Sequence, residues 1–506
     1  MNRVLLERNR YFDSVFLMRI SHDLERLPGV NRAIVAMGTP ANLANLKSAG
    51  FAADETAGEI LPQDLIIALD GVSSDAIEEA SDRLRLLLAG PTIERPGSTG
   101  TPRPMSVAEA IGLDPDVNLA LISVPGAYAA REARQALRQG LHVMLFSDNV
   151  SVEDEVALKD EAIDRGLMMM GPDCGTAILN GTPLGFANVI RRGRIGIVGA
   201  SGTGIQEVSC LIHRLGEGIS QAIGTGGRDL SGTVDARMTR FGIEALADDP
   251  ETDILVVVSK APEPAVGERV LTALRAAGKP GVVHFVAAQP KGSEDNIAFA
   301  ATLADAAGLA CATSGLEVSS DDEAHPAHAP VSGCMRALYC GGTLAQEAWA
   351  VLRRAGLEVR SNVAADSSFR IAPGTEAAGH VIWDLGDDAF TVGTPHPMIE
   401  PSLRDEAVLR VAQDPSVGIV LVDCVLGYGA HPDPAGSLGE AAKRAIEIAA
   451  AHDRNLVVVA SVTGTDEDPQ HFGRQVATLT EAGVLVAPSN AAAVRWVAAA
   501  LGGGGE

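Results

Sequence analysis

Residues 194–207 read RIGIVGASGTGIQE, an apolar run that ends in a glycine-rich turn and continues into a helical type of sequence. A strand, a tight Gly turn and a helix in this order are typical of α/β proteins with parallel sheets. Residues 341–347 read GGTLAQE and match SGTGIQE at 201–207, 140 positions earlier. Each copy follows a short apolar segment and precedes a Gly/Asp loop, so the sequence predicts two copies of one α/β unit.

Strand-like apolar runs alternate with Ala-rich helical stretches on both sides of these turns. The runs lie at 118–124, 141–146, 194–199, 254–259, 281–286, 417–423 and 456–461. Near-continuous apolar strands separated by helices indicate parallel sheets that are covered on both faces. The predicted fold class is therefore α/β, with an N-terminal Rossmann-like region followed by two related parallel-sheet units.

Two stretches interrupt this alternation. Residues 90–104 are rich in Pro, Gly, Ser and Thr and predict an exposed loop. Residues 319–330 are polar, contain proline and show no periodicity, which predicts a linker. Together with the duplication, these breaks predict domains over 1–180, 181–318 and 331–501, and a length of 506 residues fits about three domains.

The composition argues against several classes of protein. The chain has 40 basic and 65 acidic side chains, a net charge of −25, and 4% aromatic residues. Sequence-independent binding to nucleic acid or to an anionic membrane needs clustered Lys and Arg, so we expect neither partner. No apolar run reaches the roughly 18 residues of a membrane span, and residues 1–10 lack a signal-peptide core. Six cysteines without C-x-x-C spacing predict reduced thiols and a cytoplasmic protein.

The two glycine-rich turns are candidate anion sites. Glycine lets backbone N–H groups approach a ligand, and the following helix adds the positive end of its dipole. The alternative is a tight packing turn, and the first turn is neither a Walker loop nor a clean G-x-G-x-x-G. The duplication favours binding, since two related halves could direct two helix N-termini at one anion. The predicted phosphate-binding residues are Ser201, Gly202, Thr203, Gly204, Gly341, Gly342 and Thr343.

Open α/β sheets bind ligands at the carboxyl ends of their strands, so further loops there are candidates for substrate contacts. The predicted residues are Gly227, Asp229, Asp387, Gly427, Gly429, Thr463, Gly464 and Thr465. Arg228 could pair with a carboxylate or phosphate, or alternatively form a salt bridge to Asp229 or another surface acid. Asp387 and Asp388 could hold Mg²⁺, but a helix cap or a solvated turn is the preferred interpretation.

His396 lies between two prolines in an extended loop. It could act as an acid or base, or be a hydrogen-bonded loop histidine. Cys174 could be a nucleophile, but a structural thiol is favoured because no partner base can be placed. No H-x-x-x-H, C-x-x-C or HExxH pattern occurs, so no metal site is predicted.

Residues 171–208 resemble the α subunit of succinyl-CoA synthetase, and residues 331–500 resemble the carboxy-terminal domain of its β subunit. The markers in the second region are the Gly341–Glu347 turn, the Asp384-Leu385-Gly386 triplet and the segment 419–428. The whole chain is similar to the FdrA proteins, through FDSVFLMRIS (12–21), MGTPANLANL (37–46) and VGTPHPMIEPSLR (392–404). The resemblance implies a CoA-binding-type N-terminal domain, two flavodoxin-like synthetase domains, and two helix N-termini that face one phosphate.

The chain departs from the synthetase pattern in its chemistry. The synthetase carries phosphate on a histidine in a G-H-A-G loop after a K-P-strand element. Here Lys279-Pro280 is present, but residues 287–302 contain no histidine, and Lys260 stands nearest to the position of the supporting acid. An ATP-grasp domain and the N-terminal Gly-rich CoA loop have no counterpart. The sequence therefore predicts no required cofactor and does not support CoA or ATP binding.

A phosphate cradle without a phosphate carrier suits a ligand that arrives activated, such as an acyl or carbamoyl phosphate. The FdrA resemblance implies a subunit of oxamate carbamoyltransferase in purine and allantoin catabolism, exchanging carbamoyl phosphate and oxamate with phosphate and oxalurate. We take Arg228, Lys260 and His396 as candidate catalytic residues, and expect partner subunits or a homodimer. The alternatives are an acid–CoA ligase subunit that needs a separate ATP-grasp partner, and a non-catalytic binding subunit.

Overall fold

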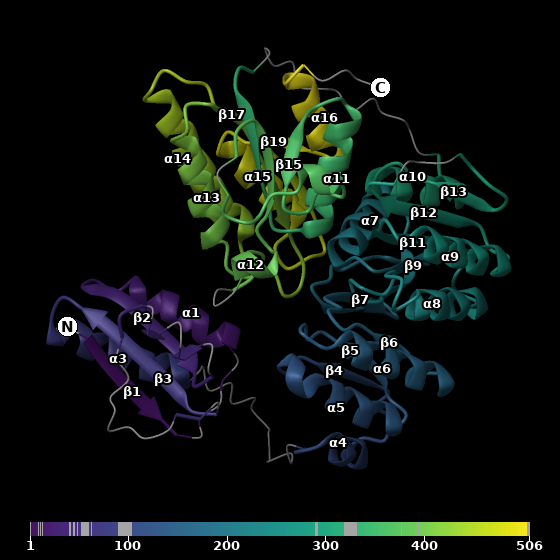
Figure 1. The fold of residues 1–506 in the computed structure, drawn as a ribbon, viewed down its shortest axis with the longest axis horizontal. Helices are drawn as coiled ribbons and strands as arrows, with labels where there is room; N and C mark the ends of the chain where they lie inside the picture. Colours follow the sequence, from purple (N-terminus) through teal and green to yellow (C-terminus); the bar gives the residue numbers. More distant parts are fainter. Residues whose placement is uncertain are drawn as a thin grey trace. The chain divides into compact units, whose positions relative to one another are not determined.

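The computed structural model describes residues 2–8, 10, 12, 14–39, 42–43, 46–47, 49–51, 60–61, 63–89, 104–288, 292–317, 331–375, 377–391 and 395–502. The chain forms two compact units (Figure 1). One comprises residues 1–103 and 388–396, and the other residues 104–387 and 397–506. The predicted linker 319–330 and the predicted loop 90–104, except Pro104, lie outside the described residues.

The first unit is built on an antiparallel sheet. Its strands β1 (Asn2–Glu7), β2 (Val30–Met37) and β3 (Leu65–Gly71) run in the order β1-β3-β2. Helices α1 (Ser14–Glu25) and α3 (Ser74–Ala89) share an apolar core with this sheet. The short helix α12 (Asp388–Thr391) belongs to the same unit.

The single Rossmann-like domain predicted for residues 1–180 is therefore wrong. A Rossmann sheet is parallel, whereas both strand pairs of the first unit are antiparallel. In β2 the buried residues Ala33, Val35 and Met37 alternate with more exposed ones, unlike the continuous apolar runs of a buried parallel strand. The unit ends at 103, well before the predicted boundary.

The second unit begins with a small parallel sheet in the order β4-β5-β6, covered by helices. This part retains the α/β character predicted for the N-terminal domain. Its elements are α4 (Val107–Leu113), β4 (Leu119–Ile122), α5 (Gly126–Arg138), β5 (His142–Leu145), α6 (Val152–Asp164) and β6 (Met169–Met170).

A seven-stranded sheet follows, in the order β13-β12-β11-β9-β10-β7-β8. Its strands are β7 (Thr176–Leu179), β8 (Thr182–Gly185), β9 (Arg192–Gly199), β10 (Ile219–Gly224), β11 (Ile254–Lys260), β12 (Gly281–Val286) and β13 (Ile297–Phe299). Its helices are α7 (Gly202–Leu215), α8 (Arg237–Asp248), α9 (Pro264–Ala276) and α10 (Leu303–Thr313). The five strands β9 to β13 are parallel and take the doubly wound order 2-1-3-4-5. We call this sheet with its helices the first half.

The second half is a six-stranded parallel sheet with its helices, in the order β15-β16-β14-β17-β18-β19. Its strands are β14 (Cys334–Tyr339), β15 (Val359–Ser361), β16 (His380–Asp384), β17 (Val417–Val425), β18 (Val457–Thr463) and β19 (Leu485–Ala487). Its helices are α11 (Gly342–Arg354), α13 (Ser402–Ala412), α14 (Pro434–Ala450), α15 (Phe472–Glu481) and α16 (Asn490–Ala500). Apart from the edge strand β15, the strand order repeats that of the first half, and the predicted α/β class with parallel sheets is confirmed.

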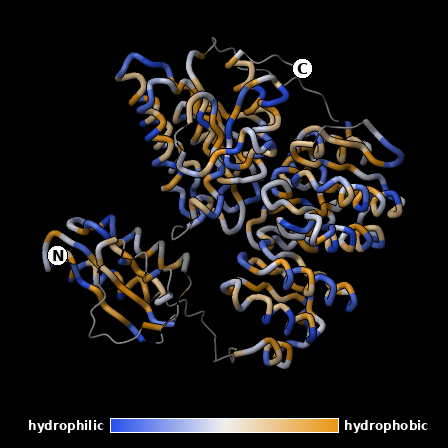
Figure 2. The backbone as a smooth tube through the Cα atoms, viewed as in Figure 1, coloured by the Kyte–Doolittle hydropathy of each residue, from blue (hydrophilic) through white to orange (hydrophobic). Residues whose placement is uncertain are grey.

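The two halves share one apolar core. It contains residues of α7 and α10 from the first half and of α11 and α16 from the second, among them Ile205, Ala307, Ala345 and Val494. Figure 2 shows hydrophobic residues concentrated along the strands. The two halves of the second unit are thus held together by burial of apolar surface.

Two glutamates exchange helix caps between the halves. Glu207 of α7 accepts the N–H of Asn490 at 3.0 Å, at the start of α16 in the second half. Glu347 of α11 accepts the N–H of Leu303 at 2.6 Å, at the start of α10 in the first half. The Gln-Glu pair repeated in the sequence therefore ends in a carboxylate that caps a helix of the opposite half.

No helix in the part of the chain that the structure describes is long and apolar enough to cross a membrane.

Candidate active site

Ser201 is the N-cap residue of helix α7 and lies two residues after the central strand β9. Its Oγ accepts the N–H of Gly204 at 3.1 Å and so caps the helix. Both Ser201 and Thr203 are buried. A Cβ atom on Gly204 would collide with Ser201 Oγ and lie 2.9 Å from Cγ1 of Val258. Close packing therefore requires glycine at 204, whatever ligand the turn binds.

Helix α11 begins at the matching turn of the second half. Gly341 is its N-cap residue, so the helix has no side-chain cap. Oγ1 of Thr343 lies 2.6 Å from Oγ of Ser201, and both hydroxyls are buried. The structure thus brings together the two turns that the sequence related, and the positive ends of two helix dipoles converge. We call residues 201–204 with 341–344 the junction.

The carboxylate of Asp423, on strand β17, binds the backbone of the turn that precedes α11. Its two oxygens accept the N–H groups of Cys340 at 2.8 Å and Gly341 at 2.7 Å. Gly341 was predicted to bind phosphate through this amide. In the structure the amide donates to a carboxylate of the chain itself, as the Gly204 amide donates to Ser201.

Asp384 lies at the same end of α11 and is the last residue of β16. Its Oδ1 accepts the N–H of Gly386 at 3.0 Å. A Cβ atom on Gly342 would stand 2.5 Å from its Oδ2, so this oxygen lies over the first residue of the helix. Asn362 bonds both the N–H and the C=O of Asp384, at 2.9 and 3.0 Å, and so fixes its backbone.

Burial dominates the electrostatics of both aspartates. It raises the pKa of Asp384 to about 7, although the Gly386 N–H and the Lys260 ammonium oppose this shift. Burial also raises the pKa of Asp423, against the opposing effects of the Cys340 N–H and the Arg404 guanidinium. A carboxyl group with a pKa near 7 can bind or release a proton at neutral pH, as acid–base chemistry requires.

Lys260 is the predicted catalytic cation that lies beside the junction. It is the exposed last residue of β11, in the first half. Its charge acts on Asp384, which belongs to the second half. The carboxyl ends of β11 and β16 are therefore near one another, as expected where two doubly wound sheets face each other.

The predicted substrate loops after β17 and β18 pack against the first half instead of standing free. Gly427 donates its N–H to the side chain of Gln470 and accepts a hydrogen bond from the same side chain at its C=O. The N–H of Tyr428 donates to the C=O of Ala187, in the first half, at 2.8 Å. A Cβ atom on Gly429 would meet the ring of Phe186 at 3.0 Å.

The loop that follows β18 makes the same kind of contact with the first half. Thr463 Oγ1 donates to Glu207 at 2.5 Å, and Thr465 Oγ1 donates to the C=O of Val189 at 2.8 Å. A Cβ atom on Gly464 would lie 2.6 Å from the Leu426 side chain. In this structure the polar groups of the loop hold the halves together, and a substrate role for these residues stays a prediction.

Asp229 belongs to a buried ion cluster, and the exposed Arg228 pairs with the edge of this cluster and not with the junction. Asp229 accepts Lys159 Nζ at 2.8 Å and caps α8 through the N–H of Thr239 at 2.8 Å. Arg228 pairs with Glu155 at 2.9 Å. Lys159 also bonds Glu155 at 2.8 Å, and both are fully buried. Arg228 thus forms a salt bridge, as in the alternative interpretation, but its partner is the buried Glu155 and not Asp229 or a surface acid. A Cβ atom on the neighbouring Gly227 would stand 3.1 Å from Oδ2 of Asp173.

Burial shifts the pKa of two other predicted reactive side chains, His396 and Cys174. His396 belongs to the first unit, and burial lowers its pKa to about 4, so the ring is neutral at pH 7. Burial raises the pKa of Cys174 to about 12, which suits the structural thiol that the sequence favoured. Asp387 accepts Asn362 Nδ2 at 3.4 Å.

Sequence reasoning did not assign Asp384 and Asp423 to the site. Each lies in or at the end of an apolar strand, where a carboxylate has no neighbouring partner in the sequence to explain it. An acid within an apolar run is a detectable signal because a buried charge needs specific partners. Asp384 has a local partner in the Gly386 N–H, but the partners of Asp423 come from the helix turn at 340–341, which only the fold brings to it.

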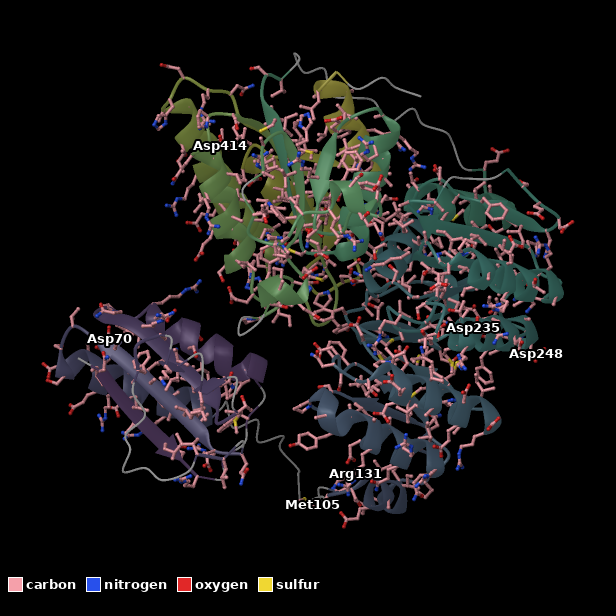
Figure 3. The ribbon with its side chains drawn as sticks, in the orientation of Figure 1. Asp70, Met105, Arg131, Asp235, Asp248 and Asp414 are labelled. Atoms are coloured by element: carbon pink, nitrogen blue, oxygen red, sulfur yellow. The ribbon has the colours of Figure 1, made fainter. Side chains whose placement is uncertain are left out.

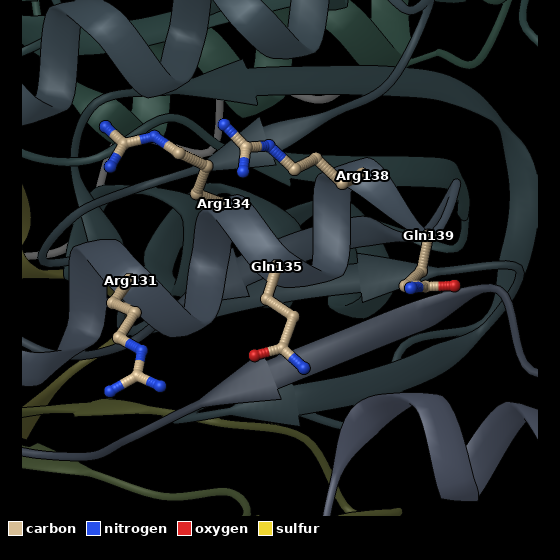
Figure 4. Close-up of a pocket in the computed structure, with 5 residues that line it drawn as sticks. All are labelled: Arg131, Arg134, Gln135, Arg138 and Gln139. Carbon is tan, nitrogen blue, oxygen red and sulfur yellow. The ribbon is translucent and has the colours of Figure 1, made fainter.

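A separate basic hollow lies on the surface of α5 (Figure 4). It encloses about 520 Å³ and is lined by Arg131, Arg134, Gln135, Arg138 and Gln139. Arg134 and Arg138 already pair with Glu161 at 3.6 and 3.4 Å. Exposed ion pairs of this kind contribute little energy and do not by themselves indicate a ligand.

Three family models match parts of the chain. A CoA-ligase model matches residues 338–500, a CoA-binding-domain model matches residues 190–287, and a model described as "AllF, heavy metal-associated domain" matches residues 1–104. The last of these ends at the boundary of the antiparallel unit.

The uncharacterized protein YahF of Escherichia coli is 44% identical over 96% of both chains. The α subunit 2 of ADP-forming succinate–CoA ligase from Archaeoglobus fulgidus is 31% identical, over 34% of this chain and 61% of that subunit. The Aquifex aeolicus α subunit is 30% identical, over 32% and 53%. A solved dinucleotide-forming acetyl-coenzyme A synthetase 1 from Ca. Korarchaeum cryptofilum covers 80% of this chain and 86% of its own, at 15% identity and a TM-score of 0.31.

The residues of the first unit do not fit the heavy metal in the description of its family model. Residues 1–104 contain no cysteine and one histidine, His22. Soft metals such as Cu⁺ and Zn²⁺ are held in proteins mainly by thiolate and imidazole groups. No group of three potential metal ligands occurs among the described residues. Residues 1–104 therefore match the family model without a thiolate ligand set.

Proposed function

The chain belongs to the FdrA/succinyl-CoA synthetase-like family, and from this premise we propose that it is an acyl-transfer subunit of the acid–CoA ligase type. The junction would bind the phosphoryl group of an acyl phosphate, with phosphate as the product that leaves. The relatives in support are acid–CoA ligase subunits that match about a third of this chain. Other subunits, including one that uses ATP, are part of the proposal.

The observation that carries the proposal is the contact between Ser201 Oγ and Thr343 Oγ1 at 2.6 Å. It places the N-termini of two helices from different halves at one point. Helix N-termini and hydroxyl groups are suited to a phosphoryl group, because they supply N–H and O–H donors and positive potential without a net charge. The same donors would stabilise the charge that grows on phosphate as it leaves.

The proposed step needs no covalent bond to the enzyme. The sulfur of CoA attacks the acyl carbon, the bond between that carbon and the phosphate oxygen breaks, and phosphate leaves with the electron pair. The thiol proton ends on phosphate, so atoms and charge balance. This route suits a chain whose residues 287–302 contain no histidine to carry phosphate.

Carbamoyl transfer to a small amide acid such as oxamate is the second candidate. The missing histidine favours it, since carbamoyl phosphate arrives already activated and the transfer uses the same phosphate site. The two candidates differ in the acceptor, a thiol or an amide nitrogen, and therefore in the product.

The test supplies acetyl phosphate with CoA, and carbamoyl phosphate with oxamate, to the full chain with and without an ATP-grasp subunit. Thioester absorbance reports the first reaction and chromatography of oxalurate the second. We expect thioester formation that falls about tenfold or more in Ser201→Ala and Thr343→Ala, since each loses a hydrogen bond to a charged group. Thr480→Ala, an exposed hydroxyl on α15, is the control.

The two products separate the candidates, and oxalurate without thioester would select the second. Radioactive phosphate retained on the chain after incubation with labelled ATP would contradict both candidates, because neither passes through a phosphoenzyme.

A further inference from the structure

Asp384 and Asp423 lie near the same turn but are held differently. Both oxygens of Asp423 are taken by the backbone amides of Cys340 and Gly341, and its side chain is fully buried. Asp384 has one oxygen on the Gly386 amide, while Oδ2 lies over Gly342. The exposed fraction of Asp384 is 8%, against 0% for Asp423, so Asp384 is the more accessible of the two carboxyl groups.

Three charged groups act on Asp384. Lys260, at the end of β11, is the cation, and Asp387 and Asp423 are the anions. Lys260 is exposed to solvent, so screening weakens its effect. The two anions favour the protonated form of Asp384, in the same direction as burial. A dianion bound at the junction would be a further and larger negative charge at this turn.

We infer that Asp384 is the proton-binding group of the junction: it takes up a proton when a phosphoryl dianion binds there, and donates that proton as a hydrogen bond to the ligand. The inference rests on the proposed function, because it concerns the same phosphate site. Two negative groups in a low-dielectric site cannot both stay ionised at low cost, as paired catalytic carboxylates show. Because its Oδ2 lies over the first residue of α11, Asp384 is the carboxyl group that a bound dianion would repel most directly.

The proton on Asp384 can take part in the proposed reaction. When the bond between the acyl carbon and the phosphate oxygen breaks, the leaving phosphate gains charge and can accept the proton of Asp384. The acceptor loses a proton in the same reaction, and the carboxylate of Asp384 can take it up. Asp384 would thus return to its starting state in each cycle, with no net change in protons on the enzyme.

The test uses sulfate, a dianion that does not titrate near neutral pH, and the full chain. Calorimetric titrations in two buffers with different ionisation enthalpies give the number of protons taken up on binding. We expect nearly one proton at pH 8, above the pKa of free Asp384, and little uptake at pH 6, where Asp384 is already protonated. Sulfate affinity should fall by up to tenfold per pH unit above pH 7.

Three variants locate the proton. Asp384→Asn should bind sulfate without proton uptake and with an affinity that no longer depends on pH. Glu440→Gln, an exposed carboxylate on α14, should behave as the native chain. Lys260→Met removes the opposing cation, so the midpoint of the uptake should move to higher pH. This variant and the native chain keep the test decisive if Asp384→Asn does not fold.

The outcomes separate the inference from the proposed function. Sulfate binding without proton uptake at pH 8, or unchanged uptake in Asp384→Asn, would overturn the role of Asp384 and leave the phosphate site standing. Failure of both sulfate and inorganic phosphate to bind at any pH would overturn the phosphate site, and the inference with it.

Discussion

The absence of a side chain at Gly342 is a requirement of the junction geometry. A Cβ atom at this position would stand 2.5 Å from Oδ2 of Asp384, whose carboxyl is held by the Gly386 amide. Glycine was predicted here for its N–H group. The structure gives it a second and independent role, which is to let a carboxylate approach the helix start.

Gly342→Ala is therefore expected to lower the free energy of unfolding by about 1–3 kcal/mol, the usual cost of overpacking. Denaturant unfolding followed by circular dichroism measures it. Gly112→Ala is the matched control. Gly112 lies in helix α4, and a Cβ atom at this position would meet nothing within 4 Å. The control should be neutral or gain about 0.5–1 kcal/mol, the preference for Ala in helices. Equal effects at both positions would contradict the packing described here.

Lys159 is the second residue with a large expected effect. Its amine is fully buried between Glu155 and Asp229, at 2.8 Å from each, and bonds the C=O of Thr225 at 3.0 Å. Lys159→Met should lower the free energy of unfolding by about 3–5 kcal/mol, since it leaves buried carboxylates without their cation.

Arg165→Met is the comparison for Lys159, because it breaks an exposed pair with Glu161 and should cost less than about 1 kcal/mol. Thermal or denaturant unfolding of both variants decides the point. A small effect for Lys159→Met would mean that the ion cluster does not join α6 to the seven-stranded sheet.

Among the helices, α7 and α11 are the elements that the sequence predicted best. The repeated G-T-x-x-Q-E pattern located both helix starts, and the structure adds the exchange of caps by Glu207 and Glu347. The partners of these carboxylates, Asn490 and Leu303, lie far from them in sequence. A local sequence pattern predicts where a helix starts. The groups that bind a buried carboxylate are brought to it only by the tertiary fold.

The cap exchange has a consequence for stability as a function of pH. Burial raises the pKa of Glu347 to about 7, above its ordinary value of 4.5. Between these values the folded state binds more protons than the unfolded state, so the free energy of unfolding falls as pH rises from about 4.5 to 7. Glu347 alone would contribute on the order of 3 kcal/mol to this fall.

Glu347→Gln should flatten this dependence without abolishing it, since Asp384 titrates in the same direction. Urea unfolding at pH 5, 6, 7 and 8 measures the slope. Glu440→Gln, which alters an exposed carboxylate, should keep the native slope. Identical slopes for the native chain and Glu347→Gln would contradict the assignment of the buried proton.

At the scale of the whole molecule, the sequence predicted the duplicated part well and the N-terminal part poorly. The two doubly wound sheets follow from continuous apolar strands and the repeated turn. The antiparallel unit was missed because none of its strands was identified in the sequence, and the region was assigned to one parallel domain. The substrate role predicted for the loops after β17 and β18 stays a prediction, and their packing against the first half could not be read from the sequence.

The net charge of −25 bears on binding at this scale. Acidic side chains such as Asp248 and Asp414 lie on the outside of the second unit (Figure 3). A chain of this charge repels anions at long range, so binding at the junction has to come from local donors. The hydroxyls of Ser201 and Thr343 and the ends of α7 and α11 are groups of this kind.

The first unit gives a prediction about metals. Equilibrium dialysis of the full chain against Cu⁺ or Zn²⁺ should find no tight site in residues 1–104, because they contain no cysteine and one histidine. His22→Ala should leave metal binding unchanged. One tightly bound metal per chain that this substitution removes would contradict the conclusion.

The central claim is that two turns from different halves form one anion site. Calorimetric titration of the full chain with inorganic phosphate tests it most directly, with native protein, Ser201→Ala, Thr343→Ala and the double variant. We predict one phosphate per chain, a loss of about tenfold or more in each single variant, and a loss in the double variant smaller than the sum, as for groups in contact. Two independent phosphates per chain, or affinity that neither substitution changes, would contradict the account.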